Sequence, residues 1–343
     1  MISADRRFAF LLACALAALL ALAIATQRGS HRTQASAVPA SPRPTAEEAS
    51  ASVARRVAPP ELSSILRPLL TVNLVDRFPG LTPAVRQSSL LPGSQIISYY
   101  GNPATAAMGI LGAADPETIA SQLEQQAARY DQLNGPIDVV PALHLVYAVA
   151  QRHPTDNGLY LQYADDADVR RYLRVTQERG MLLFLDLQIG RSSAEAELEK
   201  ILPYLRYPNV HVAIDPEFAV GSNEVPGVDL GSLQGADIDR VQAALQELVE
   251  KERLPPKLLI VHQFVDSMVV NGEAIQRYPD VELIVDMDGF GPAAVKRVKY
   301  QQYAARSYAA HAAIKLFLEH DPDLMSEEDV LSLEPTPVVV IYQ

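Results

Sequence analysis

The chain has 343 residues, with 29 Lys and Arg against 41 Asp and Glu, which gives a formal net charge of −12 at pH 7. This acidic balance argues against a basic surface that binds nucleic acid or an anionic membrane, so neither partner is expected. The length allows one large domain, since α/β barrels commonly reach about 250 residues as a single unit.

The first 25 residues have the pattern of an export signal. Arg6 and Arg7 precede an uncharged apolar run over residues 8–25, and its last three residues, Ala-Ile-Ala, have the form of a signal-peptidase site. The run is also just long enough to span a bilayer, so residues 1–25 are either a signal peptide or an N-terminal membrane anchor. We expect an extracytoplasmic protein, secreted or anchored to the cytoplasmic membrane, that meets the membrane only through this segment. The single cysteine, Cys14, lies inside the run, which excludes disulfides and thiolate nucleophiles from the exported portion.

Residues 26–60 are rich in Ala, Pro and Ser, show no apolar periodicity and contain the run PASPRPT. This composition predicts a disordered linker. A short amphipathic helix is expected over residues 60–70, and residues 61–343 are expected to form the folded domain.

From Gln95 onward, apolar runs alternate with helical patterns. The runs are short and nearly continuous in apolar character, which is typical of parallel strands buried on both faces. There are eight, at residues 96–100, 139–147, 182–188, 210–218, 258–264, 281–288, 312–318 and 338–343. Strands that alternate with helices predict right-handed crossovers, and eight such units predict a closed (β/α)8 barrel of the TIM type.

Helices are expected between most of these strands. The first begins with Asp115 as N-cap and Pro116 in the first turn, and it runs to about Gln132. The others are expected at residues 168–178, 193–204, 237–252, 292–308 and 326–333. Because the chain ends directly after the eighth strand, we expect the helix near residues 62–70 to cover that strand.

Polar residues gather at the C-terminal ends of the expected strands, which form the mouth of a barrel, where active sites are built. Side chains alternate faces along a strand, so residues i and i+2 project together. Asp215 with Glu217 and Asp286 with Asp288 are therefore expected to enter the mouth as pairs, and these four are the predicted catalytic residues. The predicted substrate-binding residues are Tyr99, Tyr100, His144, Asp186, Gln188, His262, Gln263, Lys315 and Gln343.

These residues also have structural explanations. A single Asp at a strand end can cap the next helix, a lone His near a core is often a hydrogen-bonded structural residue, and Lys315 can extend outward from its strand. Two carboxylates that share one face after a buried strand repel each other and lose hydration. That cost favours a functional role for the two acidic pairs.

Glycoside cleavage needs one carboxyl group with a raised pKa as proton donor and a second, ionised one as nucleophile, base or stabiliser of the transition state. Glu217 is the candidate acid, with Asp215 and Asp286 or Asp288 as partners. The expected substrate is a glycan of the cell envelope or the environment, or another small polar molecule. The chain has no Trp to stack on sugar rings, so Tyr99 and Tyr100 are the candidate replacements.

Two other functions stay open. A non-catalytic glycan-binding or envelope-scaffold protein would keep the same barrel and the same polar mouth. A metal-dependent hydrolase would use converging Asp, Glu and His side chains as ligands, although their spacing shows no compact ligand motif and no metal ligand is predicted. The Gly-rich stretch at residues 108–112 lacks the spacing of a phosphate or dinucleotide loop, so no cofactor is expected.

Six strings carry a resemblance to known proteins: SYYGNP (98–103), MGILG (108–112), LDLQIGRS (185–192), AIDPEF (213–218), LPPKLLIVHQF (254–264) and DMDGFGP (286–292). Together they resemble a family of exported or lipid-anchored bacterial proteins without an established activity, over most of the chain from about residue 98. More distantly, Asp215-Pro216-Glu217 is similar to the D-x-E on the fourth strand of chitinase-like and Chalaropsis-type lysozyme barrels. That resemblance implies an acid role for Glu217 and a supporting role for Asp215. The longer acidic motif of the chitinases is absent, since Ala213 stands at an upstream position.

Overall fold

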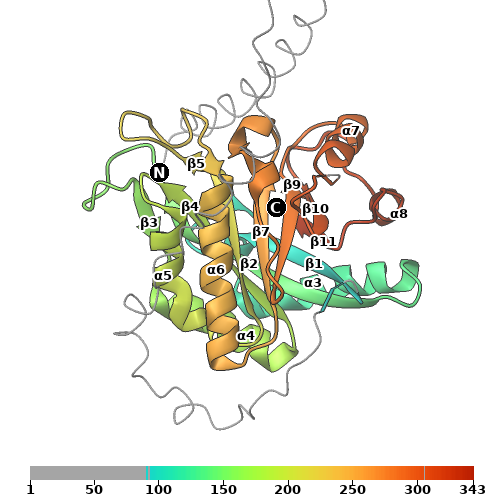
Figure 1. Ribbon diagram of the computed structural model, residues 1–343. Helices are drawn as coiled ribbons and strands as arrows, with labels where there is room; N and C mark the ends of the chain where they lie inside the picture. Colours follow the sequence, from blue (N-terminus) through green and yellow to red (C-terminus); the bar gives the residue numbers. More distant parts are fainter. Residues whose placement is uncertain (1–89, 92, 305) are drawn as a thin grey trace, which may run out of the picture. The chain divides into compact units, whose positions relative to one another are not determined.

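The computed structural model describes residues 90, 91, 93–304 and 306–343. Within them, eight parallel strands form a closed barrel, in which β1 pairs with both β2 and β11 (Figure 1). The strands are β1 (Ser94–Gly101), β2 (Asp138–Ala150), β4 (Leu182–Gly190), β5 (Val210–Ala219), β7 (Lys257–Gln263), β9 (Val281–Met287), β10 (His311–Leu316) and β11 (Val339–Tyr342). Each of the eight predicted runs coincides with one of these strands, and the predicted TIM-type barrel is confirmed.

The export segment (1–25), the linker (26–60) and the helix expected near residues 62–70 lie outside the described residues. In the part of the chain that is described, no helix combines the length and the apolar character needed to cross a membrane.

Helices connect most of the strands and lie on the outside of the barrel (Figure 1). They are α3 (Pro116–Leu133), α4 (Asp166–Arg179), α5 (Ala194–Leu205), α6 (Gly235–Glu252), α7 (Ala293–Ala304) and α8 (Glu327–Leu331). All six expected helices are present, with ends shifted by a few residues. The N-cap of α3 is as predicted, because Thr118 donates its backbone N–H to Asp115 Oδ1 at 3.0 Å.

Short elements complete the connections. The link between β7 and β9, where the sequence showed no helical pattern, contains only 3-10 turns and a two-residue strand. In the whole of the described chain, the short elements are the turns η2 (Ala106–Met108), η3 (Ile110–Gly112), η4 (Asp266–Met268) and η5 (Gly272–Ala274), and the strands β3 (Leu161–Tyr163), β6 (Leu233–Gln234) and β8 (Val269–Val270). Of these, η4, β8 and η5 form the link between β7 and β9. β3 runs antiparallel to β2, whereas β6 pairs in parallel with β8.

The barrel interior is apolar toward the N-terminal ends of the strands and ionisable toward their C-terminal ends. The alternation of side chains along each strand sends every second residue inward, and aliphatic residues fill the apolar half. Its buried members include Ile96, Ala142, Leu182, Phe184, Ala213, Leu258, Ile260, Ile284, Ala313, Val339 and Ile341. This half packs the strands together beneath the mouth.

The outward face of β11 packs against α3. Tyr342 of β11 is 4% exposed, and its hydroxyl group lies 2.8 Å from the hydroxyl group of Tyr130 on α3. Gln126 of α3 donates from its amide group to Tyr342 and also to Glu327 of α8. α3 and α8 therefore both reach the seam where the barrel closes.

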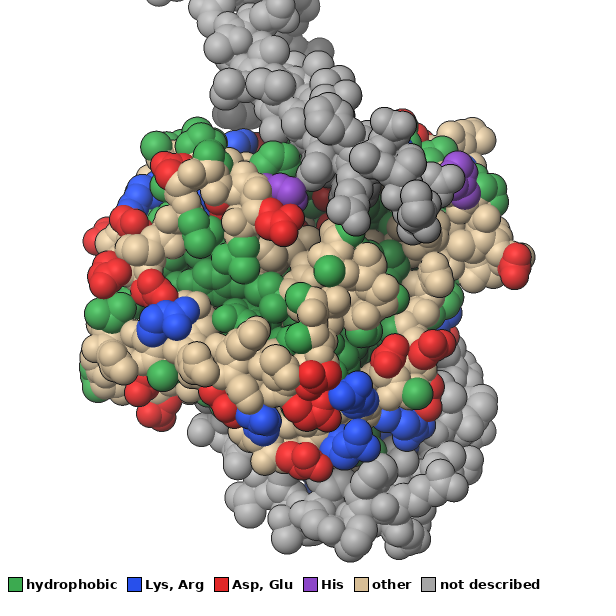
Figure 2. Space-filling model, turned by 180° about the vertical axis from the view of Figure 1, so that it is seen from behind, with side chains coloured by type: hydrophobic (Ala, Val, Ile, Leu, Met, Phe, Trp, Pro, Cys, Tyr) green, Lys and Arg blue, Asp and Glu red, His purple; other side chains and the backbone are tan. Residues whose placement is uncertain are grey.

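The charged surface is mixed in sign on the face shown in Figure 2, where Lys and Arg side chains lie among Asp and Glu side chains. Several arginines of the described chain form exposed ion pairs, among them Arg171 with Glu117 at 2.7 Å and Arg179 with Glu124 at 2.9 Å. Such pairs contribute about 0–1 kcal/mol each to stability, so the apolar interior dominates the energetics of the fold.

Candidate active site

Seven of the eight strands send an ionisable side chain into the mouth end of the barrel. Each follows the inward aliphatic residues of its own strand, so the strand that buries the core also positions the polar group. These residues are at most 3% exposed: Tyr100 (β1), His144 (β2), Asp186 (β4), Asp215 (β5), His262 (β7), Asp286 (β9) and Lys315 (β10). Together with Glu217 and Asp288, which lie two residues further along β5 and directly after β9, we call them the mouth cluster.

His262 is the centre of the mouth cluster. Its Nδ1 lies 2.8 Å from Asp286 Oδ2 and 3.3 Å from Asp288 Oδ2, and its Nε2 lies 3.1 Å from Asp186 Oδ2. Burial alone would lower the pKa of His262, but the charge of Asp186 and the hydrogen bonds to Asp186 and Asp286 raise it well above the ordinary value. The imidazole is therefore a cation that donates from both ring nitrogens.

Asp186 Oδ2 lies between two histidines, with a hydrogen bond to His262 and only a longer contact with His144. His144 Nε2 lies 3.4 Å from the same oxygen that accepts from His262. Burial opposes the charge of Asp186, but the positive charge of His262 and contacts with His144 lower its pKa below the ordinary value. His144 itself has a lowered pKa because of burial, so it stays uncharged.

Lys315 is a second buried cation, and it faces the mouth cluster from β10. Its Nζ lies 3.1 Å from Asp288 Oδ2 and 3.7 Å from the centre of the Tyr100 ring. Burial disfavours the ammonium form, but the charges of Asp288 and Asp286 raise the pKa of Lys315 above its usual value. Lys315 therefore points into the mouth and pairs with a strand-end acid, and the explanation that it extends outward is contradicted.

The Asp215-Pro216-Glu217 segment forms a β-bulge. Gln188 on β4 pairs with Asp215, but Gly190 pairs with Ala219, so β5 carries two extra residues at this point. Pro216 has no N–H for the ladder, and Asp215 Oδ1 accepts the backbone N–H of Glu217 at 3.1 Å. Bulges of this kind redirect a side chain at a barrel rim. Glu217 keeps some solvent exposure, whereas Asp215 is 3% exposed.

The two carboxyl groups of this bulge both have raised pKa values. Burial, opposed in part by the charge of His262, raises the pKa of Asp215 to about 7. Burial and the neighbouring charges of Asp215 and Asp288 raise the pKa of Glu217 to about 8. The mouth cluster therefore combines a partly exposed proton donor with carboxylates that are held by cations.

Four of the predicted substrate-binding residues are not part of the mouth cluster. Tyr99 faces outward and packs edge-on against Tyr342, with ring centres 6.2 Å apart. Gln263 also faces outward, since its Oε1 accepts from the hydroxyl group of Tyr308 at 2.6 Å. Gln188 joins two strands, accepting the N–H of Ala150 at 2.8 Å.

Gln343, the fourth of these residues, follows β11 at the rim. Its side chain lies close to the backbone of Gly109, where an added Cβ would be 3.0 Å from Gln343 Cγ. Its Oε1 is buried and accepts no hydrogen bond within the described chain. Tyr99 and Gln263 are therefore removed from the candidate site, and Gln188 and Gln343 belong to its frame and its rim.

One supporting cation was missed by sequence reasoning. Lys296 on α7 is 1% exposed, and its Nζ donates to the backbone carbonyls of Gly289 and Lys315 at 2.7 Å each and lies 3.0 Å from Asp321 Oδ2. It ties the ends of β9 and β10 together, beneath Asp288 and Lys315. Lys296 sits in a helix with two other nearby basic residues, and nothing in that pattern marks it as buried.

Two overlapping groups of side chains could hold a metal ion. They are His144, Asp186 and His262, and His262, Asp286 and Asp288, and in each group the ligand atoms lie within 4.8 Å of one another. Both groups use His262, whose two nitrogens already face carboxylates. Metal binding would therefore require His262 to lose a proton that the surrounding acids stabilise.

No family model matches the sequence, and no curated protein matches it either. The assignment of function therefore depends on the geometry and the charges of the mouth cluster.

Proposed function

We propose that this protein is a glycoside hydrolase in which Glu217 is the general acid. The observation that carries the proposal is the position of Glu217, a partly exposed carboxyl group on a bulge at the mouth of a TIM-type barrel, beside buried carboxylates and cations. Burial and the neighbouring charges of Asp215 and Asp288 raise its pKa to about 8. At neutral pH that group is protonated, as the acid in glycoside cleavage must be. The resemblance of Asp215-Pro216-Glu217 to the D-x-E of lysozyme-like barrels supports the same role.

The neighbouring groups suit the rest of the reaction. The Glu217 proton passes to the oxygen of the glycosidic bond as that bond breaks. Water then supplies a hydroxyl group to the sugar carbon, and the remaining proton of that water restores the protonated form of Glu217. Asp288, held between Lys315 and His262 and with its side chain 8% exposed, is the carboxylate best placed to stabilise the positive charge on the sugar. Asp286 is fully buried behind His262, so it is a positioning residue.

The proposal includes the place where the enzyme acts. The leader pattern in residues 1–25 supports export, and the resemblance to exported or lipid-anchored bacterial proteins agrees with it. A glycan of the cell envelope or of the surroundings is then the accessible substrate. Release of sugar from fluorescently labelled envelope glycans tests the activity, and binding of the same glycans without release would instead favour the non-catalytic alternative.

The rate of hydrolysis should fall as pH rises through about 8, because Glu217 then loses its proton. Lys315 lowers the pKa of Glu217 through its positive charge, so K315M is expected to move this alkaline limb to higher pH, whereas K315R should leave it in place. The pH profile of kcat/KM provides the measurement, with K251M on the exposed end of α6 as the control. An alkaline limb that stays in place in K315M would remove Glu217 as the titrating acid.

A metal-dependent hydrolase is the second candidate, favoured by the convergence of His144, Asp186 and His262. If it is correct, EDTA should abolish activity, added Zn²⁺ or Mn²⁺ should restore it, and the purified protein should hold about one equivalent of metal. The general-acid proposal expects unchanged turnover in EDTA. Elemental analysis of the purified protein alongside the assay decides between them.

A further inference from the structure

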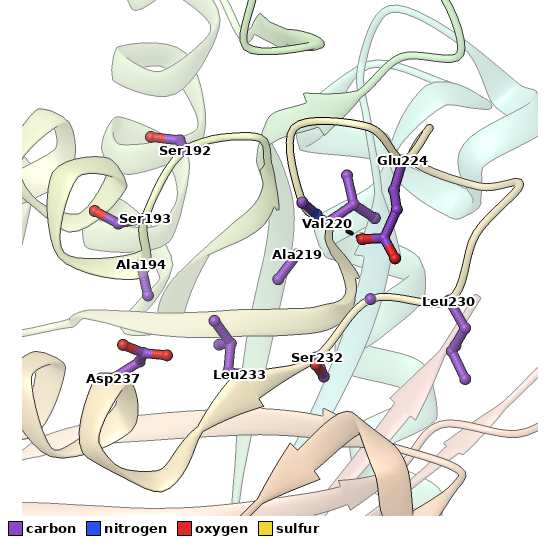
Figure 3. A pocket seen from close by; sticks show the side chains of 12 residues that line it. Ser192, Ser193, Ala194, Ala219, Val220, Glu224, Leu230, Ser232, Leu233 and Asp237 are labelled. Atoms are coloured by element: carbon purple, nitrogen blue, oxygen red, sulfur yellow. Dashed lines mark hydrogen bonds between the residues drawn. The ribbon is translucent and has the colours of Figure 1, made fainter.

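A pocket of about 390 Å³ opens beside the mouth cluster, on the same end of the barrel. Its walls come from the segments that follow β4 and β5 and from the β6 region that leads into α6. Figure 3 shows Ser192 and Ser193 on the α5 side, with Glu224 and Leu230 on the opposite side. The volume lies within the range of small-molecule sites, which is roughly 300–1,000 Å³. None of its lining residues belongs to the mouth cluster, so it is a separate site.

The pocket is joined to Glu217 through the backbone. Ala219, which lines the pocket, lies only two residues after Glu217 on β5. Gly231 donates its N–H to the carbonyl of Glu217 at 2.7 Å, and Ser232 donates to the carbonyl of Ala219 at 2.9 Å. A side chain at Gly231 would meet backbone atoms at 2.5–2.6 Å, so this close approach requires glycine. A ligand in the pocket would therefore lie at a fixed position relative to the proposed acid.

The lining indicates the chemistry of the ligand. Three hydroxyl groups, from Ser192, Ser193 and Ser232, can donate and accept hydrogen bonds, and Val220 and Leu230 offer apolar walls. Two carboxylates also line the pocket, Glu224 and Asp237, and no Lys or Arg does so within the described chain. Glu224 Oε2 accepts from Gly221 N–H at 2.6 Å, which fixes this carboxylate at the pocket wall.

We propose that this pocket is a subsite for an uncharged sugar unit of the same glycan chain, next to the unit cleaved at Glu217. Hydroxyl groups suit the serines and carboxylates, and the apolar face of a sugar ring suits Leu230 and Val220. Asp237 is ion-paired with Arg240, which does not line the pocket, whereas the Glu224 carboxylate forms no ion pair among the described residues. A phosphate or an acidic sugar would therefore meet the uncompensated negative charge of Glu224. The inference depends on the proposed function, and it names the substrate class as a neutral oligosaccharide of at least two units.

The test is a binding titration that does not depend on turnover. Calorimetry would follow binding of neutral chito- and cello-oligosaccharides of two to six units, with oligogalacturonates as the acidic comparison. All proteins would carry E217Q so that the ligands are not consumed. S232W fills the pocket from an exposed position, L230A removes an apolar wall, and S307W adds the same bulk to an exposed serine in the loop before β10, at the opposite end of the barrel.

We expect one of the neutral series to bind at least tenfold more weakly to S232W than to S307W, with a smaller loss in L230A and weak binding of the acidic series. Equal affinity of S232W and S307W for all neutral ligands would overturn the subsite, as would preference for the acidic series or no binding of any neutral oligosaccharide. If S232W weakens binding but the enzyme with Glu217 intact releases no sugar, the subsite stands and the hydrolase proposal fails.

Discussion

Replacing Glu217 by Gln is expected to lower kcat for glycan hydrolysis by about 10²–10⁴-fold, with little change in KM. The substitution keeps the size of the side chain but removes the proton that the leaving oxygen needs. The loss should be smaller with an aryl glycoside whose leaving group departs without protonation. A merely structural role for Glu217 would lower the rates of both substrates alike.

The matched control for this experiment is E178Q, which changes an exposed glutamate in the last turn of α4, at the end of the barrel opposite the mouth cluster. It should retain the full rate, and both variants should show the circular dichroism of the unchanged protein. Undiminished turnover in E217Q would remove Glu217 from the mechanism. The acid would then have to be sought in Asp215, whose pKa is also raised, to about 7.

The barrel could be predicted because two independent sequence signals identify most of its strands. Each is a short apolar run, as expected for burial on both faces, and most are followed by a helix with a clear first turn. The i and i+2 rule also succeeded for Asp286 and Asp288, which both reach His262 Nδ1. These features depend only on local periodicity, which a sequence displays directly.

The two predicted binding residues that face outward, Tyr99 and Gln263, are each adjacent in sequence to a residue that faces the interior. Adjacent residues on a strand point to opposite faces, so Tyr99 with Tyr100 and His262 with Gln263 could not both face the interior. The alternation that placed Tyr100 and His262 inside required Tyr99 and Gln263 to lie outside, as the structure has them. This correction was available from the sequence and needed no coordinates.

The central contacts of the mouth cluster could not be predicted. Asp186 and His262 lie on β4 and β7, which are separated in the barrel by β5, and they meet only because both side chains extend into the shared interior. Whether such groups touch depends on the tilt and stagger of the strands, which periodicity does not reveal. The bulge at Asp215-Pro216-Glu217 likewise depends on the register with β4, so the exposure of Glu217 could not be read from its position.

Replacing His262 by Leu is expected to lower the free energy of unfolding by about 3–5 kcal/mol, because it leaves buried carboxylates without their cation. The imidazole now lies within 3.3 Å of oxygens from Asp186, Asp286 and Asp288, and Leu fills a similar space but carries no charge. Urea denaturation at pH 6.5 gives the difference. H153L, at an exposed histidine, is the control and should change stability by less than about 0.5 kcal/mol.

The size of this loss should depend on pH, which separates charge from packing. The folded-state pKa of His262 is raised, so its contribution is fully present below the unfolded value of about 6.5 and is lost only as pH rises through the folded value. Between pH 5 and 6.5, His262 therefore adds no slope to the stability of the unchanged protein. In H262L, Asp186 loses the positive charge that lowers its pKa, so burial makes it retain a proton more readily in the folded state than in the unfolded state. Such a group lowers stability by up to about 1.4 kcal/mol per pH unit as pH rises. The difference between the two proteins should thus be larger at pH 6.5 than at pH 5, whereas an equal difference at both values would show that His262 acts through packing alone.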